Sequence, residues 1–412
     1  MKYLILLDRK FPYETGEAFL ESEIAETAKY FDKILIYPDN IAKWEKQTRE
    51  ITAKNVETHI VEKNNFKKRK IAYLFSSIGY IRQTCKIKGF KNKLAEAYFL
   101  AAANSQAKKI YNDIKQSNIK KSDKIYLYSY WLYITAEVAC ILKSKLQSEG
   151  YQNIIAFSRA HRFDIYEEKC KNNFLPHRQE LLKNLDAIYP CSNNGTQYLI
   201  NKYPEFKKKI KTSYLGTYNH GLRKYRKHSS FNIVSCSRVA KVKRVNLIID
   251  ALEGMKDSGL NLTWTHIGGG KLLEKTKQEA SEKLNWMKVD FLGQKNNTEV
   301  YDYYLNHDVD LFINVSSSEG LPVSIMEAIS FGIPAIATNV GGTSEIVEDG
   351  ANGYLLPSNF EVKKLSQLIE KITTMDNLEY QKIRHASRKK WQTQYQAQKN
   401  YSAFCTTLKE SH

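Results

Sequence analysis

The sequence predicts an α/β protein with two Rossmann-like halves. Its 412 residues are too many for one hydrophobic core. The chain opens with a strand at 2–8, a glycine-bearing loop, a helix at about 17–30 and a strand at 33–37, which is the order of a Rossmann-like unit. A similar order restarts at residue 231, and the polar, basic stretch 217–230 before it is the best candidate linker.

The first half continues this alternation. A helix is expected at 94–118, and strands are expected at 124–129, 154–157 and 187–190 with helices at 132–142 and 195–203. Gly16, in the first loop, would face the crevice at which parallel strands end, unless this loop is an ordinary turn. His161 follows the strand at 154–157 and would point into the crevice as well, although a single His is usually structural.

Composition limits the compartment and the partners. The first apolar run ends at Asp8, as a buried strand would and a signal peptide would not, and no run reaches the roughly 20 residues that span a bilayer. The six scattered cysteines suggest neither a disulfide framework nor a thiolate metal site, in keeping with a reducing cytoplasm. A net charge of +19 implies an anionic partner. We expect a cytoplasmic protein, soluble or peripheral on a membrane.

Residues 63–93 carry ten basic residues and no acidic one. Apolar residues recur between them at helical spacing: Ile71, Leu74, Phe75, Ile78 and Ile81. Such a basic amphipathic helix is a candidate for binding an anionic membrane surface. The alternative is a helix that packs against the core and has a solvated basic rim.

The second half contains a basic loop after its first strand, 231–236. This loop includes Arg238 and Lys243, and a helix follows at 245–255. Cations at a strand end beside a helix N-terminus suit a diphosphate, although the loop could also be a solvated surface. The next strand runs into Gly268, Gly269 and Gly270, and glycines there allow close approach of the backbone to a phosphate or ring.

The most informative stretch is 310–332. A buried strand at 311–315 leads through a loop to Pro322, which suits the first residue of a helix, and Gly332 suits the left-handed position after the helix. Glu319 lies in the loop and Glu327 inside the helix.

These residues offer two kinds of contact. The carboxylates need hydrogen-bond donors, such as sugar hydroxyls, and the free N–H groups at Leu321, Val323 and Ser324 suit a phosphate. This combination fits a nucleotide sugar. The alternative is that Glu319 caps a loop and Glu327 is solvated.

Asp308 and Asp310 form an Asp-x-Asp pair that could bind a divalent metal. We reject this interpretation, because the pair precedes a buried strand and would lie at the wrong end of it. Neither a metal nor a cofactor is expected.

The motif SSSEGLPVSIMEAxSxG, at 316–332, closely resembles the Glu-x7-Glu motif of family-4 glycosyltransferases, retaining enzymes of the GT-B type. SRAHRFDIYEE at 158–168 is similar to a segment of members that build bacterial surface polysaccharides, and FPYETGEAFLESEI and YSYWL look like the same subgroup. The resemblance covers nearly the whole chain and is strongest over 231–357.

The resemblance implies a GT-B fold with two Rossmann-like domains facing each other across a cleft. Residues 1–222 would bind the acceptor and 231–390 the nucleotide sugar. Residues 391–412 would form a helix that returns to the first domain and is anchored by Trp391, Tyr401 and Phe404.

The resemblance also implies roles for single residues. His161 would lie near the transferred sugar, Arg238 and Lys243 would hold the donor's phosphates, Glu319 the sugar hydroxyls and Glu327 the ribose diol. The remaining donor-binding residues would be Gly16, Gly268, Gly270, Gly320, Leu321, Pro322, Val323 and Ser324, with Gly341, Gly342 and Glu345 shaping the pocket floor.

The implied reaction is transfer of a sugar from a UDP-, GDP- or ADP-sugar to a hydroxyl of a glycan or lipid-linked acceptor, with retention and without a metal. A nucleotide-sugar epimerase can share this architecture but needs no acceptor. A nucleic-acid-binding protein would explain the charge, but the basic residues lack interleaved exposed aromatics, so no nucleic acid partner is expected.

Overall fold

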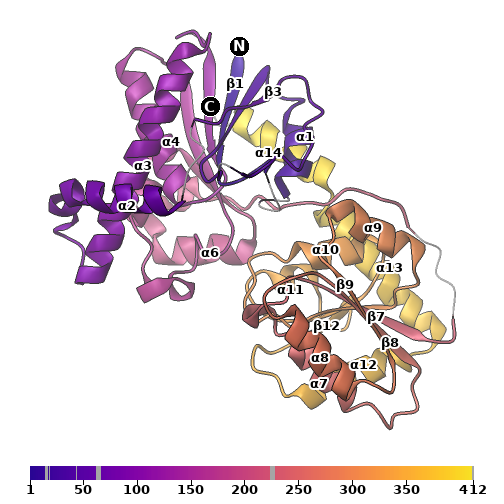
Figure 1. Cartoon of the computed structure of the whole chain (residues 1–412). Coiled ribbons are helices and arrows are strands. Elements are labelled where there is room, and N and C mark those ends of the chain that lie inside the picture. The colour runs from indigo at the N-terminus through magenta and orange to yellow at the C-terminus, as the bar shows by residue number, and fades with distance from the viewer. Residues whose placement is uncertain (14–16, 18, 43, 62–65, 223–227, 411–412) are drawn as a thin grey trace. The chain divides into compact units, whose positions relative to one another are not determined.

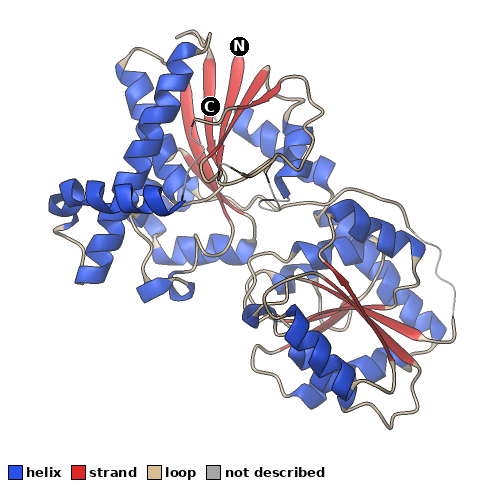
Figure 2. Cartoon of the chain, viewed as in Figure 1, coloured by secondary structure: helices blue, strands red, loops and turns tan. Residues whose placement is uncertain are grey.

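The computed structural model describes residues 1–13, 17, 19–42, 44–61, 66–222 and 228–410. The chain forms two compact units (Figures 1 and 2). Unit 1 contains Met1–Tyr214 and Tyr401–His412, and unit 2 contains Leu215–Asn400. Each unit has a six-stranded sheet in which all paired strands are parallel, with helices on both faces. The predicted α/β class with two Rossmann-like domains is confirmed.

The unit 1 sheet has the order β3-β2-β1-β4-β5-β6. Its strands are β1 (Lys2–Asp8), β2 (Lys33–Pro38), β3 (Val56–Thr58), β4 (Lys124–Ser129), β5 (Ile154–Ala160) and β6 (Ala187–Pro190). The helices are α1 (Phe19–Thr27), α2 (Phe66–Ser77), α3 (Phe90–Gln116), α4 (Ile134–Ser148), α5 (Arg178–Asn184), α6 (Asn193–Lys202) and most of α14 (Ala397–Glu410).

The apolar strands of unit 1 are covered on both faces. β1 is buried from Tyr3 to Asp8, as a continuous apolar run in a central parallel strand should be. Side chains of α3 and α4 pack on one face of the sheet. Side chains of α1 and α14 pack on the other, and α14 is the yellow helix labelled beside α1 in Figure 1.

The unit 2 sheet has the order β12-β11-β10-β7-β8-β9. Its strands are β7 (Phe231–Cys236), β8 (Leu262–Ile267), β9 (Lys288–Gly293), β10 (Leu311–Asn314), β11 (Ala335–Thr338) and β12 (Gly353–Leu356). The helices are α7 (Asn246–Glu253), α8 (Leu273–Lys283), α9 (Asn297–Asn306), α10 (Val323–Ser330), α11 (Thr343–Ile346), α12 (Val362–Thr373) and α13 (Asn377–Gln394).

The motif stretch folds as predicted. β10, α10 and β11 follow in order, and Gly332 has a φ of +70° just past the helix. α10 begins at Val323 with Pro322 at the cap position, one residue later than predicted.

The strand order of each sheet reverses once, between β1 and β4 in unit 1 and between β7 and β10 in unit 2. At such a reversal the connections leave toward opposite sides, so the loops after the two strands diverge and open a crevice. The fold alone therefore marks two places for ligands, one in each unit.

The boundary between the units differs from the prediction, because residues from Leu215 belong to unit 2. Thr217 pairs with the backbone of Tyr395 and Ala397, and its hydroxyl accepts a hydrogen bond from Trp391 Nε1 at 2.8 Å. The stretch predicted as a linker therefore begins with fixed residues, and its residues 223–227 lie outside the described part of the chain. Trp391 anchors unit 2 and not the first domain.

The C-terminal helical region is also divided. α13 ends at Gln394 and α14 begins at Ala397, so the region 391–412, predicted to form one helix, is broken near its start. Tyr401 and Phe404 pack in unit 1 as expected. None of the described helices has a stretch long and apolar enough to span a membrane.

Candidate functional site

The loop after β7 is tied to the loop after β10. The N–H of Ser317 donates to the carbonyl of Val242 at 2.8 Å. The Arg244 guanidinium donates to the carbonyls of Val315 and Ser358, both at 2.7 Å. Burial lowers the pKa of Arg244, which sits in a left-handed backbone conformation with φ +50°. Arg244 therefore holds the two loops together.

This tie brings two predicted site residues into contact. Lys243 Nζ donates to Glu319 Oε1 at 2.5 Å, and Asn314 Nδ2 donates to the same oxygen at 3.3 Å. The side chains of Lys243 and Glu319 are 22% and 12% exposed, so a ligand can reach both. Arg238 lies on the same loop as Lys243, and its side chain is exposed.

The glycine run after β8 lies against the cationic loop. Gly268 and Gly270 have φ of +144° and +145°. A Cβ on Gly268 would lie 1.9 Å from the carbonyl oxygen of Ser237, and a Cβ on Gly270 would lie 2.5 Å from that of Val239. These glycines let the backbones of two loops contact each other. The sequence predicted a close approach here as well, but to a phosphate or ring of a ligand.

A second close approach supports Glu319 from the other side. Gly341 has φ +58°, and a Cβ there would lie 2.1 Å from the carbonyl oxygen of Glu319. The N–H of Gly342 donates to the carbonyl of Gly320 at 2.7 Å. The Gly341-Gly342 pair therefore fixes the loop that carries Glu319.

The turn from Glu319 into α10 is buried from Gly320 to Val323, and Ser324 is half-buried. The first N–H groups of a helix have no partner inside it and form its positive end. This positive end of α10 therefore follows Glu319 directly in the chain, and Glu319 in turn contacts Lys243.

Glu327 is buried, which excludes the alternative that it is a solvated helix residue. Burial raises the pKa of its carboxyl to about 7. The Tyr301 hydroxyl, from α9, donates to Glu327 Oε1 at 3.1 Å, and the Tyr301 ring stacks on His220 at 3.8 Å. Neither Tyr301 nor His220 was predicted as a site residue.

In unit 1, His161 directly follows β5. Its Nε2 lies 3.0 Å from the carbonyl oxygen of Tyr130, and its ring contacts the rings of Tyr130 and Trp131. Burial lowers the pKa of His161 to about 4. At neutral pH the ring is therefore uncharged, Nε2–H donates to the carbonyl, and Nδ1 is an acceptor.

The stretches that carry the subgroup resemblance meet in unit 1. Asp164 accepts hydrogen bonds from the backbone N–H groups of His161 and Leu132, both at 2.9 Å. Glu17 accepts from Trp131 Nε1 at 2.8 Å. Asp164 thus joins the loops after β4 and β5, and Glu17 joins the loops after β1 and β4.

A buried ion pair joins β5 to α1 near these loops. Arg159 Nε donates to Glu23 Oε1 at 3.1 Å and to the Tyr128 hydroxyl at 2.8 Å, and both members of the ion pair are fully buried. The Arg159 guanidinium lies 4.3 Å from the centre of the Phe404 ring. This pair therefore fastens α14 to the unit 1 sheet.

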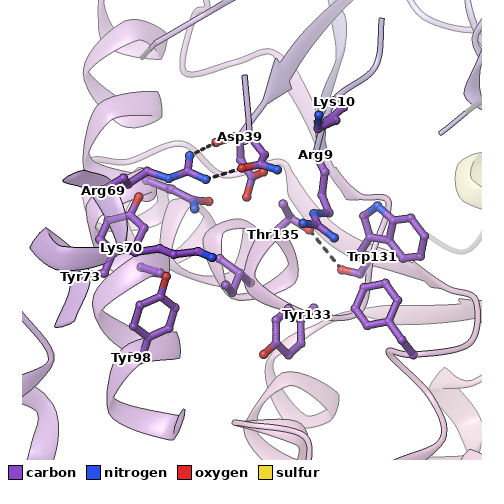
Figure 3. Close-up of a pocket in the computed structure, with 15 residues that line it drawn as sticks. Arg9, Lys10, Asp39, Arg69, Lys70, Tyr73, Tyr98, Trp131, Tyr133 and Thr135 are labelled. Atoms are coloured by element: carbon purple, nitrogen blue, oxygen red, sulfur yellow. Dashed lines mark hydrogen bonds between the residues drawn. The ribbon is translucent and has the colours of Figure 1, made fainter. Parts of the chain in front are cut away.

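A pocket of about 470 Å³ opens at the strand-order reversal of unit 1 (Figure 3). Its wall comes from the ends of β1, β2 and β4 and from α2, α3 and α4. Four cations line it: Arg9, Lys10, Arg69 and Lys70. Five aromatic residues line it as well: Tyr73, Tyr98, Trp131, Tyr133 and Phe163.

Gly16 lies outside the described residues. Asp310 accepts from the backbone N–H of Asn232 at 2.7 Å, at the start of β10 and away from the loop edge. Within the part of the chain that the structure describes, no group of three or more His, Cys, Asp or Glu side chains could hold a metal ion.

Residues 223–390 match the family model for glycosyl transferases group 1, and this match covers the greater part of unit 2. The chain is 27% identical over 244 residues to the GtfA subunit of the UDP-N-acetylglucosamine–peptide N-acetylglucosaminyltransferase of Streptococcus agalactiae, covering 57% of this chain and 47% of the relative. It is 26% identical over 237 residues to the putative colanic acid biosynthesis glycosyltransferase WcaL of Escherichia coli, covering 56% and 58%. The chain thus spans about half the length of these curated relatives.

The fold is shared over the whole chain with HepE of Anabaena, solved in complex with UDP and glucose. The TM-score is 0.67 at 17% identity, covering 98% of this chain and 99% of that one. This likeness shows that the chain has the GT-B fold.

Proposed function

We propose that the protein is a metal-independent, retaining glycosyltransferase of bacterial surface-polysaccharide synthesis. It would move a sugar from a nucleoside diphosphate sugar to a hydroxyl of a glycan or lipid-linked acceptor. The observation that carries this proposal is the meeting of Lys243 and Glu319 at the strand-order reversal of unit 2. The match of residues 223–390 to a glycosyltransferase family and the similarity to WcaL support it.

The proposed chemistry falls mainly on the leaving group. As the bond from the sugar's anomeric carbon to the diphosphate breaks, negative charge grows on the diphosphate. Lys243, Arg238 and the N-terminal end of α10 would stabilise that charge. The acceptor oxygen would bond to the anomeric carbon from the same face, and its proton would pass to the departing phosphate.

The acids would bind hydroxyls. Glu319 would accept hydrogen bonds from the donor sugar once its lysine partner turns to the diphosphate. Glu327 would accept from the ribose diol, since its carboxyl is buried and the hydroxyl of Tyr301 is a neutral partner. In unit 1, the neutral His161 would accept a hydrogen bond from a hydroxyl at Nδ1, near the transferred sugar.

An anionic membrane surface would bring the enzyme to a lipid-linked acceptor. Ile71, Leu74, Phe75 and Ile78 are between 53% and 69% exposed, so the alternative of a helix that packs these side chains into the core is wrong. Exposed cations lie near them in the sequence at Lys68, Arg82, Lys86 and Lys88. Apolar side chains rimmed by positive charge suit a bilayer with anionic headgroups.

The test is a donor screen that measures release of UDP, GDP or ADP with and without a glycan acceptor. Lys243→Ala and Glu319→Ala are each expected to lower turnover at least about tenfold, because each removes a contact to the reacting donor. Lys256→Ala, an exposed lysine of unit 2, is the control.

Three outcomes would count against the proposal. Wild-type turnover in a folded Lys243→Ala or Glu319→Ala variant would remove their assigned roles. Conversion of the donor alone, without any acceptor, would indicate an epimerase. Transfer to a peptide but to no glycan would indicate that the acceptor is a peptide, as the name of the GtfA relative states for that protein.

A further inference from the structure

Two of the cations that line the pocket at the strand-order reversal of unit 1 are not engaged in a side-chain hydrogen bond or ion pair within the described residues. Lys10 Nζ pairs with Glu45 at 2.7 Å, and Arg69 donates to Asn40 Oδ1 at 2.6 Å and to the backbone carbonyl of Asp39. Across the described residues, Arg9 and Lys70 make no side-chain hydrogen bond and no ion pair. Figure 3 shows Lys70 reaching into the pocket from one side and Arg9 from the other.

The backbone that carries Arg9 is held rigidly. Glu17 accepts hydrogen bonds from the N–H groups of Arg9 at 3.0 Å, Lys10 at 2.8 Å and Phe11 at 3.0 Å. The same carboxylate accepts from Trp131 Nε1, so it fixes a cation and an aromatic side of the pocket together. All four of these donors are neutral N–H groups, so Glu17 positions the backbone of Arg9 and makes no hydrogen bond to its guanidinium.

Aromatic rings line the pocket on both sides, with Tyr73 and Tyr98 on the side of Lys70 and Trp131 on the side of Arg9 (Figure 3). Phe163 contacts Trp131 with ring centres 4.9 Å apart and Tyr133 at 6.0 Å, and Tyr73 meets Tyr98 edge to face at 5.9 Å. These rings offer flat apolar surfaces with hydroxyl or N–H groups at their edges. Such surfaces suit a sugar ring, which has apolar C–H faces and a polar rim.

Charge and shape together define the ligand. Asp39 is the one carboxylate that lines the pocket within the described chain, and it faces four cations. A volume of about 470 Å³ falls within the range of small-molecule sites. A neutral sugar would leave Arg9 and Lys70 without partners, whereas a phosphate or carboxylate would pair with both.

We propose that this pocket binds an anionic saccharide, with Arg9 and Lys70 holding its phosphate or carboxylate and the aromatic side chains holding its ring. The inference rests on the proposed function, in which unit 1 binds the acceptor, and it narrows the acceptor to one that carries negative charge. The anion is either a phosphate attached to the sugar or the carboxylate of a sugar acid.

Three probes with the same ring test this assignment: glucose, glucuronic acid and glucose 1-phosphate. Binding to the full chain is measured by calorimetry, with and without excess UDP to fill a donor site in unit 2. At least one anionic probe is expected to bind about tenfold more tightly than glucose. The stronger of the two anions identifies the source of the charge.

The variants Arg9→Gln and Lys70→Gln are each expected to weaken binding of the anionic probe about tenfold and to leave glucose binding unchanged. Lys108→Gln removes an exposed charge of α3 outside the pocket and is the matched control.

The proposal is overturned if neither anion binds more tightly than glucose, or if the Arg9→Gln Lys70→Gln double variant binds both anions like the wild type. UDP binding by the same samples separates the two levels of inference. If the wild-type protein binds UDP but shows no preference for the anionic probes, only this inference is wrong. If it binds no nucleotide, the proposed function is wrong.

Discussion

The two strand-order reversals present different chemistry on sheets of the same topology. In unit 2 the loops bring a lysine against a partly exposed glutamate, and the following helix carries another glutamate, which is buried. In unit 1 the loops bring cations against aromatic rings, with one lining carboxylate among the described residues. Equivalent topology therefore fixes where a ligand binds, and the loop sequences decide which ligand it is.

The difference extends to how each site is supported. Unit 2 relies on glycines that let backbones touch, at Gly268, Gly270 and Gly341. Unit 1 relies on buried acids that accept backbone N–H groups, namely Glu17 and Asp164. A backbone contact tolerates no added carbon atom, whereas an acid can be replaced by a smaller or neutral group. The two units should therefore respond differently to substitution.

The largest expected effect is on the stability of unit 1. Arg159→Met leaves Glu23 as an unpaired buried charge, which should lower the stability of unit 1 by about 3–5 kcal/mol. Thermal unfolding followed by calorimetry measures the shift, and UDP binding reports on unit 2 separately. Lys208→Met, at an exposed site of unit 1, is the control. An unshifted transition for unit 1 would show that the ion pair does not hold it together.

The next effect concerns the glycine contacts of unit 2. Gly341→Ala should displace the carbonyl of Glu319 and lower turnover at least about tenfold, because small misplacements of catalytic groups are costly. Gly259→Ala is a matched control, since Gly259 has a similar φ of +69° and open space around its Cβ position. Equal losses in both variants would attribute the effect to backbone strain and not to the contact.

A smaller effect should appear in the pH dependence of nucleotide binding. Burial raises the pKa of Glu327 to about 7, so its carboxyl is mostly protonated at pH 6 and mostly ionised at pH 8. If the ionised form accepts the ribose hydroxyls, UDP affinity should rise up to about tenfold between these values. Glu327→Gln should remove this rise while keeping any pH dependence of UDP itself.

The same variant tests stability with the opposite sign. A raised folded-state pKa means that the native protein binds more protons than the unfolded one between about pH 4.5 and 7, so this group makes the protein less stable as pH rises through that window. Glu327→Gln should therefore raise the melting temperature of unit 2 at pH 8. A lower melting temperature there would show that ionised Glu327 is well compensated in the free protein.

The smallest expected effect concerns the membrane surface of unit 1. Phe75→Ser should reduce binding to anionic vesicles about fivefold in a sedimentation assay, because one exposed aromatic is lost from the apolar patch. Leu378→Ser, at a similarly exposed apolar site of unit 2, serves as the control. Failure of the wild type to bind anionic vesicles at any salt concentration would end the membrane proposal.

Much of the fold could be predicted because the central strands are continuous apolar runs. β1 and β10 were placed within a residue of their observed bounds. β3 was missed, since it has only three residues and they alternate too briefly to give a pattern. α9 was missed too, although Asn296 and Glu299 form a capping box that could have revealed its start.

The site in unit 2 was more predictable than the pocket in unit 1. Glu319 and Glu327 lie on one short strand–loop–helix unit, so local order brings them to the same edge. The pocket joins Arg9, Lys70 and Phe163, which are distant in sequence, and only the sheet order brings their elements together. The sequence of the basic helix was compatible with packing against the core or with binding a membrane. The exposure of side chains such as Phe75 in the structure excludes packing against the core.

The path of the chain has a consequence for biosynthesis. α14 completes one face of the unit 1 sheet through Phe404, Cys405 and Leu408. A ribosome delivers these residues only after it has made all of unit 2. One apolar face of the nascent unit 1 therefore stays uncovered during that interval. We expect unit 2 to reach its native state first and chaperones to bind the exposed face of unit 1.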